Sequence, residues 1–225
     1  TAGVKEPNIS VTLETARDWT AEHSKQLPPI NIGRCFVYGS GYSGAVPAGK
    51  IGLRVPAGAA FGSGNHATTK GCLLAMDRMR VISDGPVLDM GSGSGILALA
   101  AARLWRRPVL AVDIDPVAVQ VATENIAANC QKHLVKGICA PGYRHRDIGS
   151  KKFDVIISNI LARPLVRMAC DLVHHLAPGG IAVLSGLYSQ DANWVLGAHR
   201  RVGLRKVGRI DLDGWATLVM RGKGV

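Results

Sequence analysis

The chain has 225 residues, of which 47% are hydrophobic and 19% are charged. This length can bury the core of one large domain or of two small ones, and the composition is that of an ordinary globular protein. No run approaches the roughly 18 consecutive apolar residues of a membrane-spanning helix, which excludes such a helix. Lysine and arginine exceed aspartate and glutamate by 27 − 16 = 11. This positive charge either serves solubility alone or indicates a polyanionic partner such as RNA or a ribonucleoprotein.

The cysteines and histidines do not form a metal-binding pattern. The five cysteines are scattered without a C-x-x-C pair, and the histidines lack H-x-x-x-H spacing. An odd, unclustered set of cysteines predicts reduced thiols rather than disulfides or zinc ligands. We therefore expect a cytoplasmic protein that binds no metal ion.

The first 56 residues predict an extension followed by a hairpin. An alternating run at 8–15 and a short helical pattern precede a Pro-Pro breaker, so we expect residues 1–33 to form an N-terminal extension and linker. Two strand-like runs within 34–56 then predict a β-hairpin that begins the main domain of residues 34–225.

From residue 67 on, helical patterns alternate with apolar strands, which predicts a mostly parallel sheet with helices on both faces. Asp213-Gly214 lies between the last two strand-like runs and predicts a tight hairpin, so one strand at the end should be antiparallel. The expected fold is a Rossmann-like α/β sheet of seven strands. The predicted strands are 87–90, 109–113, 134–139, 154–158, 181–185, 205–212 and 215–221, and the predicted helices are 68–79, 95–104, 116–129, 161–175 and 189–201.

The stretch VLDMGSGSGIL (87–97) joins a buried strand to a helix through Gly91, Gly93 and Gly95. The dinucleotide fingerprint G-x-G-x-x-G requires a glycine where this chain has Ile96, which disfavours a pyrophosphate-binding turn. Glycine still allows a tight turn and a close approach to a ligand. Asp113 ends the next strand, where a carboxylate can accept hydrogen bonds from both hydroxyls of a ribose.

The role of Asp89 stays open between forming the glycine turn and touching a ligand. Asp115 and Pro116 are expected to start the next helix as N-cap and first residue. The G-x-G-x-G turn, the acid at 113 and the terminal hairpin together resemble the class I S-adenosylmethionine-dependent methyltransferases. That class often has an acid after the third strand to hold the adenine, whereas the stretch VKGICAPGY (135–143) offers only backbone and small side chains.

Six motifs carry a narrower resemblance. They are AFGSGNHATT, LDMGSGSGILALAA, DIDPVAV, SNILARPL, LAPGGIAVLSGL and GWATLV, in that order. Across roughly residues 18–221 they resemble the bacterial methyltransferases of large-subunit ribosomal protein eleven, the PrmA family. The resemblance implies S-adenosylmethionine as cofactor and methylation of lysine ε-amino and N-terminal α-amino groups of that ribosomal protein, with contact to ribosomal RNA as a further expectation and a monomer favoured. It also implies cofactor contacts at Thr69, Gly91, Asp113 and Asn159, and a substrate-recognition domain of which only a remnant precedes the linker here.

The remaining site predictions concern Asn159 and the first glycine-rich stretch. Asn159 ends the fourth strand, beside the glycine turn, where its side chain and the Ile160 carbonyl would accept hydrogen bonds from the attacking amine; alternatively, Asn159 caps the next helix. His66 is either a general base or the donor or acceptor of a hydrogen bond that orders its loop. Phe61 packs over the cofactor or belongs to the core. We expect AFGSGNHATTKG (60–71) to cross the mouth of the pocket, with Thr69 reaching the cofactor.

Three other functions compete with this one. In the nearest alternative, the enzyme transfers the methyl group to an amine of RNA or of a different protein. A nicotinamide-dependent oxidoreductase would use the same fold class, but Ile96 and the terminal hairpin argue against it. A non-catalytic ribosome-binding module is the last alternative, and the intact site residues argue against that one.

Overall fold

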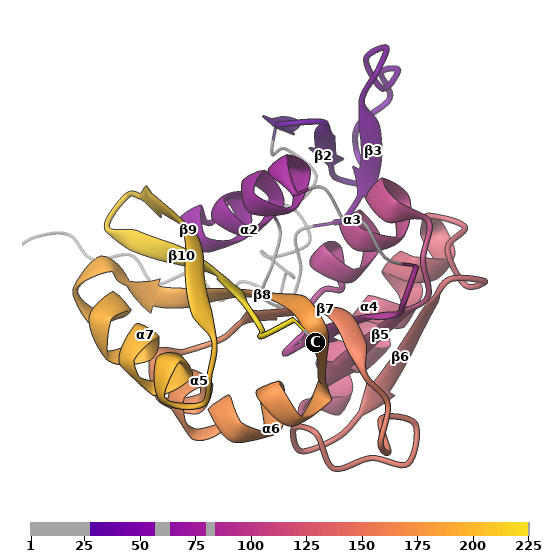
Figure 1. Cartoon of the computed structure of the whole chain (residues 1–225). Helices are drawn as coiled ribbons and strands as arrows, with labels where there is room; N and C mark the ends of the chain where they lie inside the picture. Colours follow the sequence, from indigo (N-terminus) through magenta and orange to yellow (C-terminus); the bar gives the residue numbers. More distant parts are fainter. Residues whose placement is uncertain (1–27, 57–63, 80–83, 225) are drawn as a thin grey trace, which may run out of the picture.

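The computed structural model describes residues 28–56, 64–79 and 84–224, and its largest element is a seven-stranded sheet. The sheet has the order β6-β5-β4-β7-β8-β10-β9, and helices cover both of its faces (Figure 1). Its strands are β4 (Val87–Met90), β5 (Val109–Asp113), β6 (Val135–Cys139), β7 (Phe153–Asn159), β8 (Leu176–Tyr188), β9 (Arg205–Leu212) and β10 (Trp215–Arg221).

Strands β4 to β8 pair in parallel, and β10 is antiparallel to both β8 and β9. Asp213 and Gly214 both have positive φ angles, 49° and 78°, in the turn between β9 and β10. Two successive positive φ angles are the conformation that a tight hairpin between twisted strands requires. The predicted fold class, seven strands with one antiparallel, is confirmed.

The helices follow the predicted order with small shifts at their ends. The sequence predicts one helix at 161–175, but Met168, at φ −92° and ψ 8°, interrupts it. The strand predicted at 181–185 is longer, because β8 pairs with β7 on one side and β10 on the other. The helices are α2 (Ala67–Arg78), α3 (Ile96–Trp105), α4 (Pro116–Ala128), α5 (Ala162–Arg167), α6 (Ala169–His175) and α7 (Ala192–Arg201), with a 3₁₀ turn, η1 (Ser189–Asp191).

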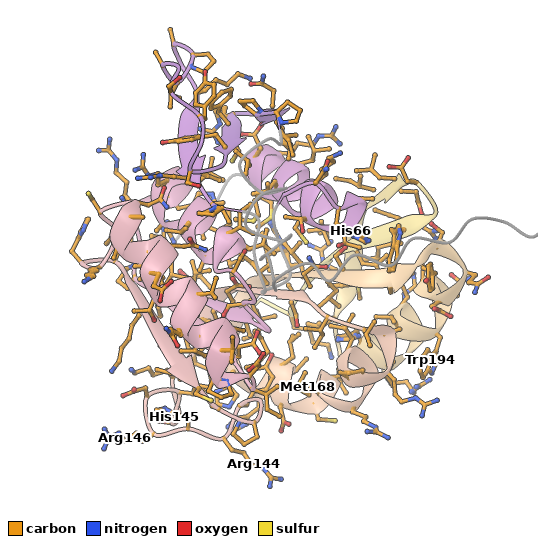
Figure 2. The ribbon with its side chains drawn as sticks, turned by 180° about the vertical axis from the view of Figure 1, so that it is seen from behind. His66, Arg144, His145, Arg146, Met168 and Trp194 are labelled. Atoms are coloured by element: carbon orange, nitrogen blue, oxygen red, sulfur yellow. The ribbon has the colours of Figure 1, made fainter. Side chains whose placement is uncertain are left out.

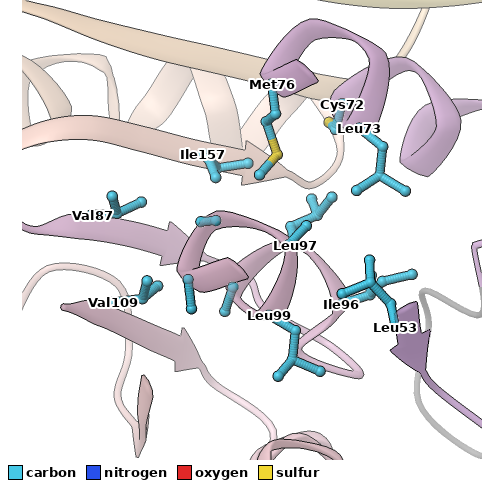
Figure 3. Close-up of a cluster of buried hydrophobic side chains, with 14 of the residues drawn as sticks. Leu53, Cys72, Leu73, Met76, Val87, Ile96, Leu97, Leu99, Val109 and Ile157 are labelled. Atoms are coloured by element: carbon cyan, nitrogen blue, oxygen red, sulfur yellow. The ribbon is translucent and has the colours of Figure 1, made fainter. Parts of the chain in front are cut away.

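The core has two parts, one on each face of the sheet. Successive strand residues point to opposite faces, so Val87 packs on one side and Leu88 on the other. Figure 3 shows the first part, where Met76 of α2 and Leu97 of α3 cover Val87 and its neighbours. The second part lies under α5, α6 and α7. This double cover explains why the strands read as continuous apolar runs.

The predicted hairpin at 34–56 is wrong. Strand β2 (Cys35–Tyr38) pairs in parallel with β3 (Ile51–Arg54), and the hairpin partner of β2 is instead β1 (Ile30–Ile32). The turn between β1 and β2 contains Gly33 at φ 54°, so the short hairpin lies where the sequence predicts a breaker. The proposed boundary after residue 33 therefore runs through a hairpin. Residues 1–27, including the predicted strand at 8–15, lie outside the described residues.

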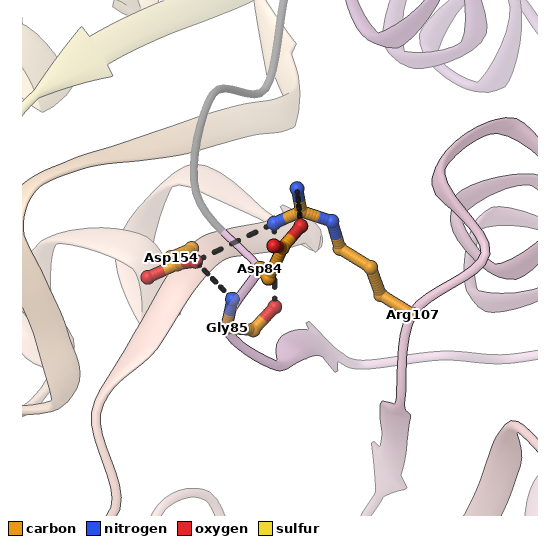
Figure 4. A network of polar contacts seen from close by, with 4 residues as sticks. All are labelled: Asp84, Gly85, Arg107 and Asp154. Carbon is orange, nitrogen blue, oxygen red and sulfur yellow. Dashed lines mark hydrogen bonds and ion pairs between the residues drawn. The ribbon is translucent and has the colours of Figure 1, made fainter.

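A polar network fastens the amino ends of the central strands. Arg107, which precedes β5 and is buried, lies 3.4 Å from Asp154 of β7 and 3.3 Å from Asp84 (Figure 4). Asp154 Oδ2 also accepts a hydrogen bond from the Gly85 amide at 2.5 Å. These contacts connect the segment before β4 to β7 and to Arg107 before β5. They lie at the amino ends of the strands, opposite the cavity described below. Across the described ranges, no helix has both the length and the apolar character needed to cross a membrane.

Candidate functional site

A cavity of about 750 Å³ opens at the carboxyl ends of the strands. The chain runs from β4 outward through β5 to β6, then returns to place β7 on the other side of β4. Such a reversal leaves a crevice between the diverging loops, which is where open α/β sheets bind ligands. Residues after β4, β5, β6 and β7, together with the end of β8 and the start of β10, line this cavity.

The glycine turn after β4 forms the floor of one half of the cavity. Gly91 has φ 78°, and a Cβ built on it would lie 2.2 Å from Ile160 Cγ2, so a larger residue does not fit. Gly91 and Gly93 line the cavity. Gly95, which the sequence predicts as a cofactor contact, does not line it: this residue is the N-cap of α3 at φ 78°, with Ala122 of α4 packed 3.1 Å from where its Cβ would lie.

Asp113 lies on the cavity wall at the end of β5, as predicted. Its Oδ2 accepts a hydrogen bond from the Gly93 amide at 2.8 Å, and its Oδ1 accepts one from the Asp115 amide at 3.1 Å. A carboxylate has about four acceptor positions, so these two bonds orient the group and leave capacity for two hydroxyls. Asp115 caps α4 through the Val117 amide at 2.9 Å, with Pro116 at the first helical position, which confirms that prediction.

Asp89 lies directly under the glycine turn and is completely buried. Its Oδ2 accepts a hydrogen bond from the Ala98 amide in the first turn of α3 at 2.9 Å, and its Oδ1 is buried without a partner in the described part of the chain. Burial raises the pKa of the carboxyl to about 7; the Ala98 hydrogen bond opposes this rise, and the charge of Asp113 adds to it. Of the two open roles, the structure supports that of turn former, because Asp89 is not among the residues lining the cavity.

Asn159 and Thr69 meet on the other side of the glycine turn. Asn159 is the last residue of β7, and its Nδ2 lies 3.4 Å from Thr69 Oγ1 of α2. Its Oδ1 is buried and has no partner among the described residues, although the side chain lines the cavity. The helix-capping alternative for Asn159 is wrong, because α5 begins at Ala162 and its N-cap is Leu161.

A pair of buried hydroxyl groups, on Ser185 and Thr217, packs behind Asn159 and Thr69. Ser185 is the register partner of Asn159 on β8, and its Oγ lies 2.8 Å from Thr217 Oγ1. The same hydroxyl lies 3.1 Å from the Ala216 carbonyl and 3.4 Å from the Thr68 carbonyl. Three elements, α2, β8 and β10, are thereby joined next to the cavity. Sequence reasoning did not single out Ser185.

His66 caps α2. Its Nδ1 accepts a hydrogen bond from the Thr68 amide at 3.3 Å and lies 2.8 Å from Thr68 Oγ1. The loop-ordering role is therefore the one seen, and the side chain also lines the cavity. Figure 2 labels His66 and Met168, which line the same cavity from different elements. Phe61 and the first part of AFGSGNHATTKG lie outside the described residues, so their predicted position over the pocket stays a prediction.

The end of the cavity beside β5 and β6 is apolar. Ile114, which follows Asp113, lines it with 72% of its surface exposed. Pro141 and Gly142 follow β6, as the sequence suggested, but Met168 completes this end: its sulfur lies 3.3 Å from where a Cβ on Gly142 would be. At this end of the cavity, a flat base would find apolar side chains and backbone groups to contact. No sequence pattern pointed to Met168, since it comes from a distant helix break.

Two further residues of the wall were missed in sequence reasoning. Gly186 near the end of β8 has φ 83°, and a Cβ on it would lie 2.3 Å from the Ile160 carbonyl oxygen, so this glycine lets the chain after Asn159 pass close by. Trp215 begins β10 and also lines the cavity. The available signal was position: Gly186 lies near the carboxyl end of a parallel strand, and Trp215 directly follows the hairpin turn.

Comparisons with known proteins show the family of this chain. The sequence model of the family described as "Ribosomal protein L11 methyltransferase (PrmA)" matches residues 1–223. A relative from Mesorhizobium japonicum with the name "Ribosomal protein L11 methyltransferase" is 41% identical over 207 residues, 91% of this chain and 71% of its own length. One of the same name from Caulobacter is 42% identical over 217 residues, 95% of this chain and 75% of its own length.

Solved structures give the same result for the fold. The crystal structure of a ribosomal protein L11 methylase from Lactobacillus delbrueckii subsp. bulgaricus superposes with a TM-score of 0.78 at 28% identity, over 87% of this chain and 98% of that one. An RNA methyltransferase from Salinibacter ruber, solved with S-adenosyl-L-homocysteine, superposes with a TM-score of 0.54 at 18% identity, over 67% of this chain and 90% of that one. The second likeness is one of fold alone.

Proposed function

This chain belongs to the family of ribosomal protein L11 methyltransferases, and from that premise we propose that it methylates lysine ε-amino groups and the N-terminal α-amino group of ribosomal protein L11. The chain is an S-adenosylmethionine-dependent methyltransferase. The finer specificity, for lysine ε-amino groups and the N-terminal α-amino group, is what the family resemblance implies.

The residues of the cavity fit the cofactor. S-adenosylmethionine supplies an electrophilic methyl group on a sulfonium when it is bound. We assign the ribose hydroxyls to Asp113, whose two remaining acceptor positions are oriented by the amides of Gly93 and Asp115. The apolar end with Ile114 and Met168 suits the adenine, and the turn at Gly91 allows the backbone to approach closely. This assignment rests on the shape and hydrogen-bonding capacity of the wall.

The observation that carries the proposal is that Asn159 Oδ1 has no hydrogen-bond partner among the described residues. A buried carbonyl oxygen without a hydrogen bond costs about 1–3 kcal/mol, and the Asn159 side chain lines the cavity, so we infer that its missing partner is a donor that arrives with the substrate. An amine offers such a donor. We propose that Asn159 Oδ1 and the Ile160 carbonyl accept its N–H groups and thereby aim the nitrogen lone pair. Transfer of the amine out of water favours its neutral form, which is the nucleophile.

No residue in this scheme acts as a general base. His66 uses Nδ1 to cap α2, so the proposal gives it a structural role, with the amine proton lost to water before the amine is enclosed. The dependence of kcat/KM on pH tests whether His66 acts as a base, because a histidine base would add a bell-shaped component. We expect kcat/KM to rise with pH until the amine itself is deprotonated, with no separate step near neutrality.

The experiment compares Asn159→Ala with an exposed asparagine control, Asn193→Ala on α7. Radiolabelled methyl transfer is measured onto free ribosomal protein L11 and onto ribosomes that lack methylation, and the label is located in protein or RNA. We expect the label in L11, a kcat reduced about 100-fold in Asn159→Ala, and no change in Asn193→Ala. Near-normal kcat with normal cofactor affinity in Asn159→Ala would remove the role of Asn159, and label in RNA would replace the proposed substrate.

A further inference from the structure

Three aromatic rings from three elements form a continuous surface at one end of the cavity. Tyr188 stacks on Trp215 with ring centroids 4.2 Å apart and planes at 29°, and His66 contacts Trp215 edge-on at 4.8 Å. His66 and Trp215 line the cavity, while Tyr188 continues the surface outward. We call these three rings the aromatic wall.

The wall is held by backbone pairing and by a polar clasp behind it. Trp215 and Tyr188 are register partners of β10 and β8, and the Ser189 amide donates to the Gly214 carbonyl at 2.9 Å. Arg209 binds the carboxylate of Asp211 through two nitrogens, at 2.7 and 2.8 Å. Asp211 in turn accepts a hydrogen bond from Ser189 Oγ at 2.6 Å. The corner that carries Tyr188 is therefore fixed, and the rings are preorganised.

The aromatic wall lies in the substrate half of the cavity. Asp113 and the apolar end lie beyond β4, whereas the wall comes from α2, β8 and β10 on the side of β7 and Asn159. Among the described residues that line the cavity, Asp113 is the only carboxylate, and it belongs to the other half. An ammonium group next to Asn159 would therefore contact aromatic rings and a carbonyl oxygen. The aromatic wall itself offers it no carboxylate as an ion-pair partner.

We propose that the aromatic wall is the binding subsite for the alkylammonium head of the substrate, above all in its methylated forms. This proposal rests on the proposed function, because it takes the acceptor to be an amine. Methylation replaces N–H donors by apolar methyl groups while the nitrogen remains cationic. A ring face attracts such a cation and packs against its methyl groups, whereas Asn159 has fewer N–H groups to bind after each transfer. The two parts of the wall thus recognise different stages: Asn159 the free amine, the rings the methylated one.

Tyr188 extends this subsite to the surface. Tyr188 is 51% exposed, and Leu161, which lies after β7 and lines the cavity, is 70% exposed. A contiguous exposed apolar patch beside a cavity marks a contact surface, and we assign both side chains to the proposed subsite. The aliphatic stem of a lysine side chain is of the right chemistry to lie between them, since it buries methylene groups while its head remains polar.

The test is a binding measurement on the full chain saturated with S-adenosylhomocysteine. The probes are Nα-acetyl-trimethyllysine amide and its neutral isostere, in which a carbon replaces the charged nitrogen. We expect the wild-type protein to bind the cationic probe about 3- to 30-fold more tightly than the neutral one. Trp215→Leu should lose this preference, Trp215→Phe should keep part of it, and Tyr188→Ala should weaken both probes while Tyr188→Phe does not.

The control variant is Trp194→Leu, which removes an exposed tryptophan of α7 that does not line the cavity and that lies apart from His66 in Figure 2. It should bind both probes as the wild type does, and S-adenosylhomocysteine should bind equally to all variants. Equal binding of the two probes by the wild type, or an unchanged preference in Trp215→Leu, would overturn the subsite. Because no ribosomal protein is present, a charge preference that Trp215 controls supports the subsite even if L11 proves not to be the acceptor, and L11 methylation with no such preference refutes the subsite alone.

Discussion

Replacement of Asp89 by asparagine should change how the stability of this protein depends on pH. The carboxyl is fully buried, one oxygen is bound to the Ala98 amide and the other has no partner among the described residues. Burial raises its pKa from 3.8 to about 7. Between these two values the folded protein holds a proton on Asp89 that the unfolded chain has released. The folded state therefore binds more protons, and its free energy of unfolding falls as the pH rises through this window.

The magnitude follows from the size of the shift. The difference of about 3 pKa units, each worth about 1.4 kcal/mol, corresponds to roughly 4 kcal/mol over the whole window. From pH 5 to pH 8 the titrating part spans about 2 units, or roughly 3 kcal/mol. In the Asp89→Asn variant the new side-chain amide would keep an oxygen for the Ala98 amide and would place an uncharged NH₂ where the free carboxyl oxygen lies. That unsatisfied donor costs about 1–3 kcal/mol at every pH, much as the protonated carboxyl does.

The assay is denaturant unfolding of Asp89→Asn and of the wild type at pH 5 and pH 8, without cofactor. We expect similar stabilities at pH 5 and a variant that is more stable than the wild type by roughly 3 kcal/mol at pH 8. Asp171→Asn, an exposed position on α6, controls for the loss of one aspartate. If the stabilities of Asp89→Asn and wild type change in parallel from pH 5 to pH 8, Asp89 does not hold a proton in the folded state and the reasoning fails.

Three further variants test separate parts of the structure. Gly186→Ala should lose most methyl transfer, because its Cβ would lie 2.3 Å from the Ile160 carbonyl oxygen at a φ of 83°; steady-state kinetics would show this, and unchanged kcat would mean that the chain after β7 can shift freely. Asp113→Asn should weaken S-adenosylmethionine binding by about 10-fold or more in calorimetry, and it should also lower the melting temperature, because its NH₂ would face one of the two amide donors of Gly93 and Asp115. Equal affinity would contradict the ribose assignment. Arg107→Met should lower the free energy of unfolding by about 2 kcal/mol by stranding Asp154, with cofactor affinity unaffected because this network lies at the opposite edge of the sheet; a loss of affinity would indicate coupling across the sheet.

The sequence alone determined the local elements and one half of the site. The buried strands and the helices could be predicted from the sequence, because periodicity and turn chemistry involve only neighbouring residues, as at Asp213-Gly214. The glycine spacing around Gly91 and the acid at Asp113 were likewise found, since both follow directly from the end of a strand. Ile96 excluded the dinucleotide fingerprint without any structure.

Only the tertiary structure decided the pairings and the aromatic part of the other half of the site. Runs 34–39 and 50–56 look like a hairpin, yet β2 and β3 pair in parallel, and the antiparallel partner of β2 is β1 on its other edge. Trp215 and Tyr188 meet because β10 inserts between β8 and β9, a choice made among strands far apart in the chain. That Asn159 Oδ1 has no hydrogen-bond partner among the described residues likewise depends on which distant segments pack around it. Such contacts arise from burial of the whole core, which no short window of residues encodes.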